Sequence, residues 1–565
     1  MLSSSSFLLF ILIISANPCV RAYNQGGNGI AEEFEDVKRS DFPAGFLFGV
    51  STSSYQIEGA ILEDGKSLSD WDVFVRKIGN IKNGDTGDIA TDHYHRYMED
   101  IEIIHSLGAD AYRFSISWPR ILPNGKSGGV NAAGIMFYNS IIDNLLLRGI
   151  QPFVTIYHWD MPQVLSDKYG GWLNPLIQDD FLHFAETCFK NFGDRVRYWV
   201  TINEPNTVAE CAYERGKHPP GHCSPPLGNC SAGNSDTEPL IAVHNMLLAH
   251  AKASKLYREQ FLASQILRGV IGMVLHSFMF EPLTDDEHNK EAADRALAFN
   301  LAWALDPLVF GDYPPEMRRY HGNELPKFTS EERLLIRDSI DFIGLNHYST
   351  LYAKDCIHSS CSCSGSACLP GGDRAILGFV STSAENGGVL IGEPTGMPRF
   401  SVVPRGMEEI VDYTVNRYDN KPIFITENGY SSPLQQDQLD GLQHDVKRIE
   451  FHQAYLASLA RAMRNGADVR GYFVWTLMDN FEWSFGYDVK FGLYSVDRAT
   501  LNRNPRSSAK WYRNFLRNIS SNGMKPRTAF SLWSKVGRAE EEDIEHMFIE
   551  HMFIFGIYKN GEDIE

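Results

Sequence analysis

Short, nearly continuous apolar runs recur along the chain. Runs of this kind are typical of strands that are covered on both faces in a parallel sheet. We count eight, at residues 46–50, 111–116, 151–157, 198–202, 270–276, 342–345, 423–426 and 471–477. Segments with a helical period lie between them, at residues 92–107, 135–147, 180–192, 240–256 and 444–463.

This alternation predicts an α/β fold, a single (β/α)8 TIM barrel with elaborated βα loops. The alternative is an open, doubly wound sheet. As a nucleotide binder, such a sheet would need a Gly-rich phosphate loop after an early strand, and the sequence shows none.

Polar and aromatic residues follow seven of the eight runs directly. In a barrel of this kind the catalytic groups emerge at the carboxyl ends of the strands, so we expect these residues to meet there. They are Gln56 and Glu58, Ser117 and Trp118, His158 to Asp160, Asn203 and Glu204, Asn346 to Tyr348, Glu427 and Asn428, and Asp479 to Trp483.

Glu204 and Glu427 are the candidate catalytic pair. Cleavage of an acetal needs a proton on the leaving oxygen and stabilisation of an oxocarbenium-like centre, and two carboxyl groups can supply both. Strands four and seven of eight lie on roughly opposing walls of a barrel. A single Glu after a strand is more often a helix cap or an ion-pair partner. Because Glu58 and Glu482 also follow strands, position alone does not identify the pair.

Composition and charge narrow the function classes. Apolar residues make up 43% of the chain and charged residues 22%, as in soluble globular proteins with a large core. The net charge of −19 disfavours nucleic acid and anionic membrane surfaces as partners. No long Pro- or Gly-rich linker divides the chain, so we expect one catalytic domain at residues 41–520.

The two ends of the chain lie outside this domain and differ from it in composition. The apolar run at 6–16 is too short to span a bilayer and predicts a signal peptide over residues 1–22. Residues 23–40 are an N-terminal extension, and the acidic segment 521–565 is a C-terminal extension that can be disordered. We therefore expect the secretory pathway, with the cell exterior or cell wall favoured and the vacuole as the alternative.

The cysteines fit an oxidising compartment. After removal of the leader eight of the nine remain, and Cys223 and Cys230 are spaced to close a small loop. A cluster in a Ser/Gly-rich stretch can form two bridges in any of three pairings, with a zinc site as the alternative; it comprises Cys356, Cys361, Cys363 and Cys368. Cys188 and Cys211 are expected to be buried free thiols. Sequons at Asn229 and Asn518 permit glycosylation.

Five motifs resemble glycoside hydrolase family 1, and most closely its plant β-glucosidases. The resemblance covers residues 41–518, and the stretch 356–404 is most similar to members that act on phenylpropanoid or monolignol glucosides. The motifs are Gln-Ile-Glu-Gly at 56–59, Tyr-His-Trp-Asp at 157–160, Thr-Ile-Asn-Glu-Pro at 201–205, Ile-Thr-Glu-Asn-Gly at 425–429 and Asp-Asn-Phe-Glu-Trp at 479–483.

This resemblance assigns roles to the two carboxylates. It implies that Glu204 is the acid/base and that Glu427 is the nucleophile, so that anomeric configuration is retained. Related plant thioglucosidases carry Gln at the position of Glu204, and the Glu here favours O-glucosides.

The resemblance also implies the substrate contacts. Gln56, His158, Asn203, Glu482 and Trp483 match positions that hold the sugar, and the acidic Glu482 argues against phosphorylated sugars. Further matching positions are Tyr348, which donates to the nucleophile, its neighbour Asn346, Trp475 in the aglycone site and Phe491 beside the sugar. No cofactor or metal is expected, because His93 and His95 would face different sides of one helix.

These implications define the expected activity, which is hydrolysis of terminal, non-reducing β-D-glucosyl residues from plant O-glucosides with an aromatic aglycone. The expected partner is this small-molecule substrate. Transfer of glucose to an alcohol or phenol through the same intermediate is one alternative. A non-catalytic sugar-binding protein is a more distant one, since such a protein would tolerate loss of either Glu.

Overall fold

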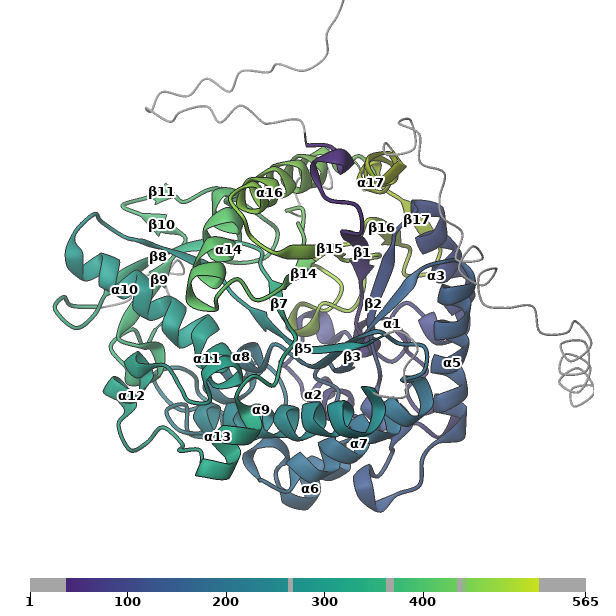
Figure 1. Ribbon diagram of the computed structural model, residues 1–565, viewed down its shortest axis with the longest axis horizontal. Coiled ribbons are helices and arrows are strands. Elements are labelled where there is room, and N and C mark those ends of the chain that lie inside the picture. Colours follow the sequence, from purple (N-terminus) through teal and green to yellow (C-terminus); the bar gives the residue numbers. More distant parts are fainter. Residues whose placement is uncertain (1–36, 263–267, 362–369, 434–440, 442, 518–565) are drawn as a thin grey trace, which may run out of the picture. The chain divides into compact units, whose positions relative to one another are not determined.

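The computed structural model describes residues 37–262, 268–361, 370–433, 441 and 443–517. A closed barrel of parallel strands stands at its centre, in the order β1-β15-β14-β7-β5-β4-β3-β2 (Figure 1). The strands are β1 (Leu47–Ser51), β2 (Ala111–Ser115), β3 (Gln151–Tyr157), β4 (Tyr198–Asn203), β5 (Val270–His276), β7 (Phe342–Asn346), β14 (Ile423–Asn428) and β15 (Val469–Trp475). Each predicted run is therefore a barrel strand, and the (β/α)8 prediction is confirmed.

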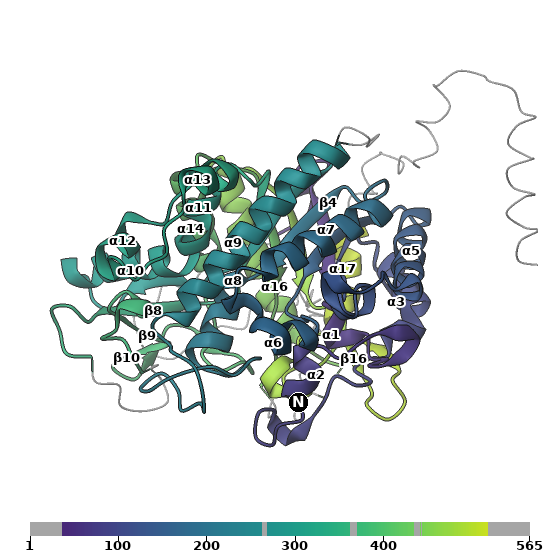
Figure 2. The same cartoon turned by 90° about the horizontal axis from the view of Figure 1, so that it is seen from below.

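Helices surround the barrel. The five predicted ones are α3 (His93–Leu107), α5 (Ala132–Leu147), α7 (Ile177–Phe192), α9 (Glu238–Leu256) and α16 (Val446–Arg464). Helices α7 and α9 lie side by side, as Figure 2 shows. The other α-helices described are α1 (Ser54–Ile57), α2 (Asp70–Phe74), α4 (Trp118–Ile121), α6 (Gln163–Tyr169), α8 (Pro205–Val208), α10 (Glu287–Leu297), α11 (Trp303–Phe310), α12 (Pro315–His321), α13 (Ser330–Ile336), α14 (Arg405–Arg417) and α17 (Ser507–Arg517).

The amino end of the barrel interior is filled by aromatic side chains that lie over glycines. A Cβ on Gly49 would lie 2.4 Å from Cδ1 of Phe473, and one on Gly471 would lie 2.8 Å from Cδ1 of Phe424. Glycine is therefore required at both places. In barrels of this kind the catalytic groups stand at the other end, where the loops that follow the strands meet.

The loops at the carboxyl end carry small sheets of their own. Figure 1 shows β8 to β11 and α10 grouped to one side of the barrel. The sheets are β6 (Met279–Pro282) with β8 (Thr350–Asp355) and β9 (Val380–Ser383), β10 (Glu385–Asn386) with β11 (Val389–Leu390), β12 (Glu393–Pro394) with β13 (Ser401–Val402), and β16 (Tyr494–Val496) with β17 (Arg503–Pro505).

Two disulfides lie in these loops. Cys223 is bonded to Cys230, as predicted. Cys356 is bonded to Cys361, which excludes both from a zinc site, while Cys363 and Cys368 lie outside the described residues.

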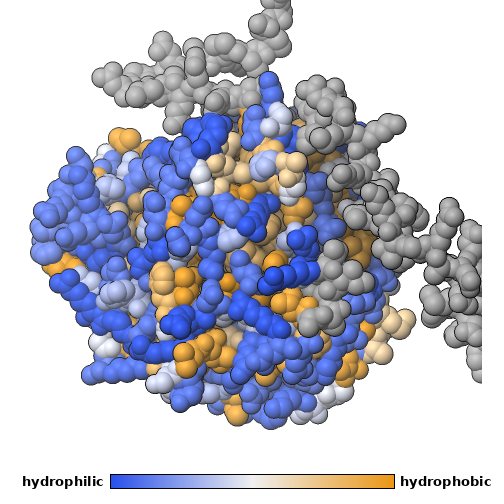
Figure 3. Space-filling model, viewed as in Figure 1, coloured by the Kyte–Doolittle hydropathy of each residue, from blue (hydrophilic) through white to orange (hydrophobic). Residues whose placement is uncertain are grey.

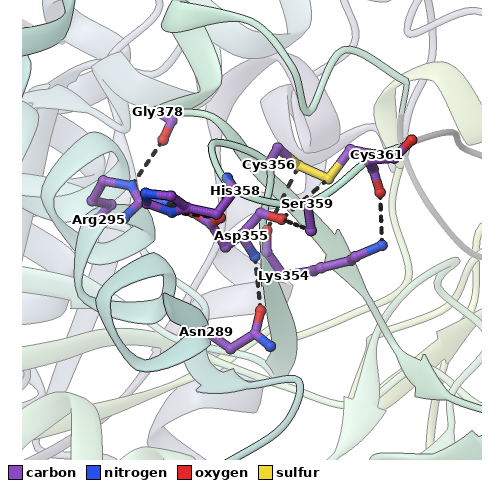
Figure 4. The surroundings of a disulfide bond; sticks show 10 residues. Asn289, Arg295, Lys354, Asp355, Cys356, His358, Ser359, Cys361 and Gly378 are labelled. Atoms are coloured by element: carbon purple, nitrogen blue, oxygen red, sulfur yellow. Dashed lines mark hydrogen bonds and ion pairs between the residues drawn. A yellow bond between two sulfur atoms is a disulfide. The ribbon is translucent and has the colours of Figure 1, made fainter. Parts of the chain in front are cut away.

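The Cys356–Cys361 loop is held against α10 (Figure 4). The buried Asp355 pairs with Arg295 at 2.5 Å, and the guanidinium of Arg295 also donates to the carbonyl of Gly378 at 3.1 Å. This ion pair fixes the end of β8 to the helix that follows β6.

The two other cysteines among the described residues are free thiols: Cys188 is buried, as expected, whereas Cys211 is only half-buried. Cys211 lies in a single π-helical segment, η6 (Ala209–Glu214), which follows α8 and leaves its side chain partly accessible.

The predicted leader at 1–22, most of the extension at 23–40 and the segment 521–565 lie outside the described residues. Within the described part of the chain, no helix is long and apolar enough to cross a membrane. The face drawn in Figure 3 is mainly hydrophilic, with small hydrophobic areas scattered across it.

Candidate active site

The polar residues expected to meet do meet at the carboxyl end of the barrel. Asn203 and Asn346 are the last residues of β4 and β7, and Glu427 lies near the end of β14. Glu204 follows β4 directly, and Trp475 ends β15.

Glu427 is buried and bound by two donors. It is 4% exposed, its Oε1 accepts from Nη1 of Arg113, and its Oε2 accepts from the hydroxyl of Tyr348 at 2.7 Å. Burial raises the pKa of Glu427 to about 7, and Glu204 acts in the same direction. Arg113 and Tyr348 oppose this rise because both stabilise the ionised carboxylate.

Glu204 has only neutral donors. Asn346 donates through Nδ2 to its Oε1 at 2.6 Å. Burial raises the pKa of Glu204, and hydrogen bonds from Asn346 and Thr207 only partly oppose this. The backbone of Glu204 is left-handed, with φ of 47° and ψ of 62°, a conformation that non-glycine residues rarely adopt.

A hydrogen-bond network joins the surroundings of the two carboxyls across four strands. Arg113 donates through Nη2 to Oδ1 of Asn203 at 2.6 Å, and Asn346 donates to the same oxygen at 3.3 Å. Thr426 donates to Oδ1 of Asn346 at 2.6 Å. Residues of β2, β4, β7 and β14 therefore hold Glu204 and Glu427 in one fixed constellation.

The ring of His158 lies beside this network and is nearly parallel to two indole rings. Its ring stacks on Trp475 at 5.9 Å and on Trp483 at 6.0 Å between centroids. Burial holds the pKa of His158 well below its usual range, so the ring is neutral. Because Oδ1 of Asn203 accepts from Arg113, its amide NH2 donates to Nε2 of His158 at 3.2 Å, which leaves the proton on Nδ1.

Gln56 and Glu482 form a second polar group. Nε2 of Gln56 donates to the carbonyl of Phe481 at 3.0 Å and to Oδ1 of Asn480 at 3.1 Å, and it lies 3.4 Å from Oε2 of Glu482. Burial, with Glu427 adding to it, raises the pKa of Glu482 to about 8.

Trp475 and Phe491 lie together beside the tyrosine that binds Glu427. Both are 3% exposed and pack with Tyr348 in one apolar cluster. The rings of Tyr348 and Phe491 are 5.9 Å apart.

Two residues of this site were missed by sequence reasoning. Arg113 is a charged residue in the middle of the apolar run 111–116, and that mismatch was the available signal. His276, the last residue of β5, packs against Tyr348 with ring centroids 6.2 Å apart. Nothing in the run 270–276 indicated that this residue lies beside the site.

Three other titratable residues noted in the sequence have structural partners. Glu58 pairs with Arg120 at 2.9 Å. His93 contacts Asp100 at 2.7 Å inside the protein, whereas His95 is exposed and contacts Asp92 at 2.6 Å. The described residues contain no group of three or more His, Cys, Asp or Glu side chains suited to a metal ion.

Comparison with known proteins assigns the family. The profile of Glycosyl hydrolase family 1 matches residues 38–522. A rice protein named "Probable inactive beta-glucosidase 14" is 52% identical over 482 residues, covering 85% of this chain and 92% of the relative. A coniferin β-glucosidase from Pinus contorta is 50% identical over 487 residues, covering 85% and 93%.

A solved structure supports the same family assignment. The crystal structure of a rice β-glucosidase superimposes with a TM-score of 0.80 at 44% identity, covering 85% of this chain and 99% of that one. With a family profile spanning most of its length and relatives at half identity, the chain belongs to glycosyl hydrolase family 1.

Proposed function

We propose that this glycoside hydrolase is a retaining β-glucosidase in which Glu427 is the nucleophile and Glu204 the acid/base. One observation carries the assignment: a buried arginine and a tyrosine hydroxyl donate to Glu427, whereas Glu204 has only neutral donors. Two neighbouring buried carboxyls hold one negative charge more readily than two. The charge therefore resides on Glu427 and the proton on Glu204.

The two steps follow from this distribution. The Glu427 carboxylate attacks the anomeric carbon while the glycosidic C–O bond breaks, and the Glu204 proton passes to the leaving oxygen. The new ester removes the charge of Glu427, which lowers the pKa of Glu204. Glu204 then takes a proton from water, whose oxygen attacks the anomeric carbon and releases Glu427 as a carboxylate.

The neighbouring polar groups suit a neutral hexose. Nδ1 of His158 and Nδ2 of Asn480 are buried and have no hydrogen-bond partner in the described part of the chain, so both can donate to sugar hydroxyls. Arg113 holds Asn203, which we expect to contact the 2-hydroxyl, an interaction that strengthens as charge develops at the anomeric carbon. Glu482 would repel a phosphorylated sugar once it is ionised.

Chemical rescue tests the two roles. A Glu427→Gly variant supplied with azide should give a glucosyl azide of inverted configuration, because the anion replaces the nucleophile directly. A Glu204→Ala variant with azide should give the retained product, because the anion attacks the covalent intermediate. If the two configurations were exchanged, the assignment would be wrong.

For the aglycone we propose an aromatic group of the phenylpropanoid class. The similarity to a coniferin β-glucosidase and the aromatic side chains around Tyr348 support this. A panel of monolignol glucosides, flavonoid glucosides and cello-oligosaccharides tests it by kcat/KM. Preference for the oligosaccharides would contradict it.

Two rival functions are separable by experiment. Transfer to an added alcohol, seen by product analysis, would identify a transglucosidase that uses the same intermediate. A non-catalytic protein is the state implied by the name of the rice relative. Both carboxylates and their donors are in place here, so we expect turnover of a simple aryl β-glucoside.

We also propose that the protein enters the secretory pathway. Two disulfides among the described residues support an oxidising compartment. A fluorescent fusion that remained in the cytosol would contradict this.

A further inference from the structure

A cavity of about 100 Å³ lies beside the helix that follows Glu204. Its walls come from α8 and η6 on one side and from α10, η9 (Ala298–Ala302) and the β6-β8-β9 sheet on the other. A single water needs only about 10–15 Å³ of such space, so the cavity can take a group of several non-hydrogen atoms.

The lining is aromatic with unpaired polar atoms set into it. The apolar part includes Phe278, Phe299 and Trp303. Apart from Oε1 of Glu214, which lies in an ion pair with Arg215 at 3.0 Å, four buried polar atoms of lining residues have no hydrogen-bond partner in the described part of the chain: the acceptors Oδ1 of Asn206 and Oδ1 of Asn300, and the donors Nε1 of Trp303 and Nε of Arg399. Buried groups of this kind are costly unless an occupant satisfies them.

Arg399 is held in place by contacts that leave its Nε available. Its Nη2 donates to the hydroxyl of Thr382 at 2.7 Å, and its guanidinium lies 5.9 Å from the centre of the Phe278 ring. Its backbone is left-handed, with φ of 67°, a conformation that costs free energy for arginine. Glu210 and Glu214 lie near Arg399, and both pair with Arg215 of the same lining, at 3.3 Å and 3.0 Å.

A continuous series of rings leads from the nucleophile to this cavity. Tyr348 donates to Glu427 and lies 6.2 Å from the ring of His276, which in turn lies 4.8 Å from the ring of Phe278. Because its ring contacts Tyr348 as well as Phe278 of the lining, His276 connects the surroundings of Glu427 to the cavity wall.

On the basis of the proposed β-glucosidase function, we propose that this cavity binds the far end of an aromatic aglycone carrying a neutral alcohol. The hydroxyl oxygen accepts from Nε of Arg399, and its proton is donated to Oδ1 of Asn206. Arg399 is then a specificity-determining residue.

A neutral alcohol fits the unpaired polar atoms of the cavity better than a carboxylate does. The cavity presents both unpaired acceptors and unpaired donors, and a hydroxyl can serve both kinds, whereas a carboxylate only accepts.

The test compares three glucosides: coniferin, whose aglycone ends in an alcohol; phenyl β-glucoside, which lacks that side chain; and the glucoside of the corresponding cinnamic acid. Arg399→Met removes the donor at similar length. We expect the ratio of kcat/KM for coniferin to that for phenyl β-glucoside to fall roughly tenfold or more, mainly through KM. The wild-type protein should favour the alcohol over the acid.

A second variant fills the cavity without touching Arg399. Ala296 lines it, and Ala296→Leu should lower the same ratio. Arg461→Met is the matched control, because Arg461 pairs with Glu408 between α14 and α16, outside the cavity and the catalytic site. Thermal unfolding of each variant verifies folding.

The outcomes separate the two proposals. If both cavity variants leave the ratio unchanged, or if the wild type favours the acid, the cavity inference is overturned and the β-glucosidase proposal stands. If the folded wild type cleaves none of the three glucosides, the proposed function fails and this inference fails with it.

Discussion

Glu427 and Glu58 make the same two kinds of contact at different places on the carboxyl end of the barrel. Each is 4% exposed. Each pairs with a fully buried arginine, Arg113 for Glu427 and Arg120 for Glu58. Each also accepts from a tyrosine hydroxyl, which belongs to Tyr348 in one case and to Tyr138 in the other.

What differs is the second layer of contacts. Arg120 lies over the ring of Tyr94 at 4.1 Å and donates to the carbonyl of Gly59 at 3.2 Å, so the Glu58 pair fastens α1 to its neighbours. Arg113 instead continues to Asn203, the residue before Glu204, and so connects Glu427 to a second carboxyl. We therefore expect that a buried Glu–Arg–Tyr group does not suffice for catalysis. The adjacent carboxyl with neutral donors makes the difference.

The two glutamates should respond oppositely to the same change. Glu427→Gln should lower kcat at least about 10⁴-fold, because it removes the nucleophile while keeping the side-chain shape. Glu58→Gln should leave kcat per folded molecule within a few-fold, but should lower the free energy of unfolding by about 3–5 kcal/mol, because Arg120 then stays buried without its counter-charge. Kinetics and denaturant unfolding measure both. If folded Glu58→Gln lost as much kcat as the Glu427 variant, the expected difference between the two glutamates would be contradicted.

The next largest difference in kcat is expected between variants of the two arginines. Arg113→Met should lower kcat by about 10²–10³-fold, since a preorganised charged donor to the nucleophile and to Asn203 is lost. Arg120→Met should act on stability and leave kcat per folded molecule nearly unchanged. Active-site titration with a mechanism-based fluoroglucoside gives the folded, competent fraction of each. Equal kcat values for the two variants would contradict separate roles.

The tyrosines should give the smallest effect, and it should depend on pH. The Tyr348 hydroxyl lowers the pKa of Glu427, so Tyr348→Phe should raise that pKa. The acid limb of kcat/KM should then move to higher pH by roughly one unit, the value of one hydrogen bond to a charged group. Tyr138→Phe should leave that limb in place. A shift to lower pH in the Tyr348 variant would show that Tyr348 favours the protonated form.

The barrel was readable from the sequence because its strands are apolar on both faces. The end of β15 could not be predicted as well. The apolar run continues to Leu477, but the strand ends at Trp475, because the backbone of Thr476 pairs with the backbone of Phe491 and Leu493. An apolar pattern does not distinguish a barrel partner from a loop partner. Strand bounds therefore depend on tertiary contacts that the run cannot encode.

The same limit applies to the site. Glu204 and Glu427 could be found because each directly follows or ends an apolar run, but their roles came only from resemblance. Arg113 was counted as part of a strand. Its positive charge is nevertheless what distinguishes the surroundings of Glu427 from those of Glu204. Arg399 and Asn206 carried no sequence signal, since the cavity that they share joins loops distant in the chain.

The left-handed backbone at Glu204 sets stability against activity at this position. Glycine would adopt that conformation without strain, whereas a glutamate there costs about 1–3 kcal/mol in addition to burying its carboxyl. Mutation alone, filtered only for folding, would favour loss of the side chain. A Glu204→Gly variant should therefore be more stable than the wild type while it loses the proposed acid/base, so the residue at this position lowers stability in return for activity.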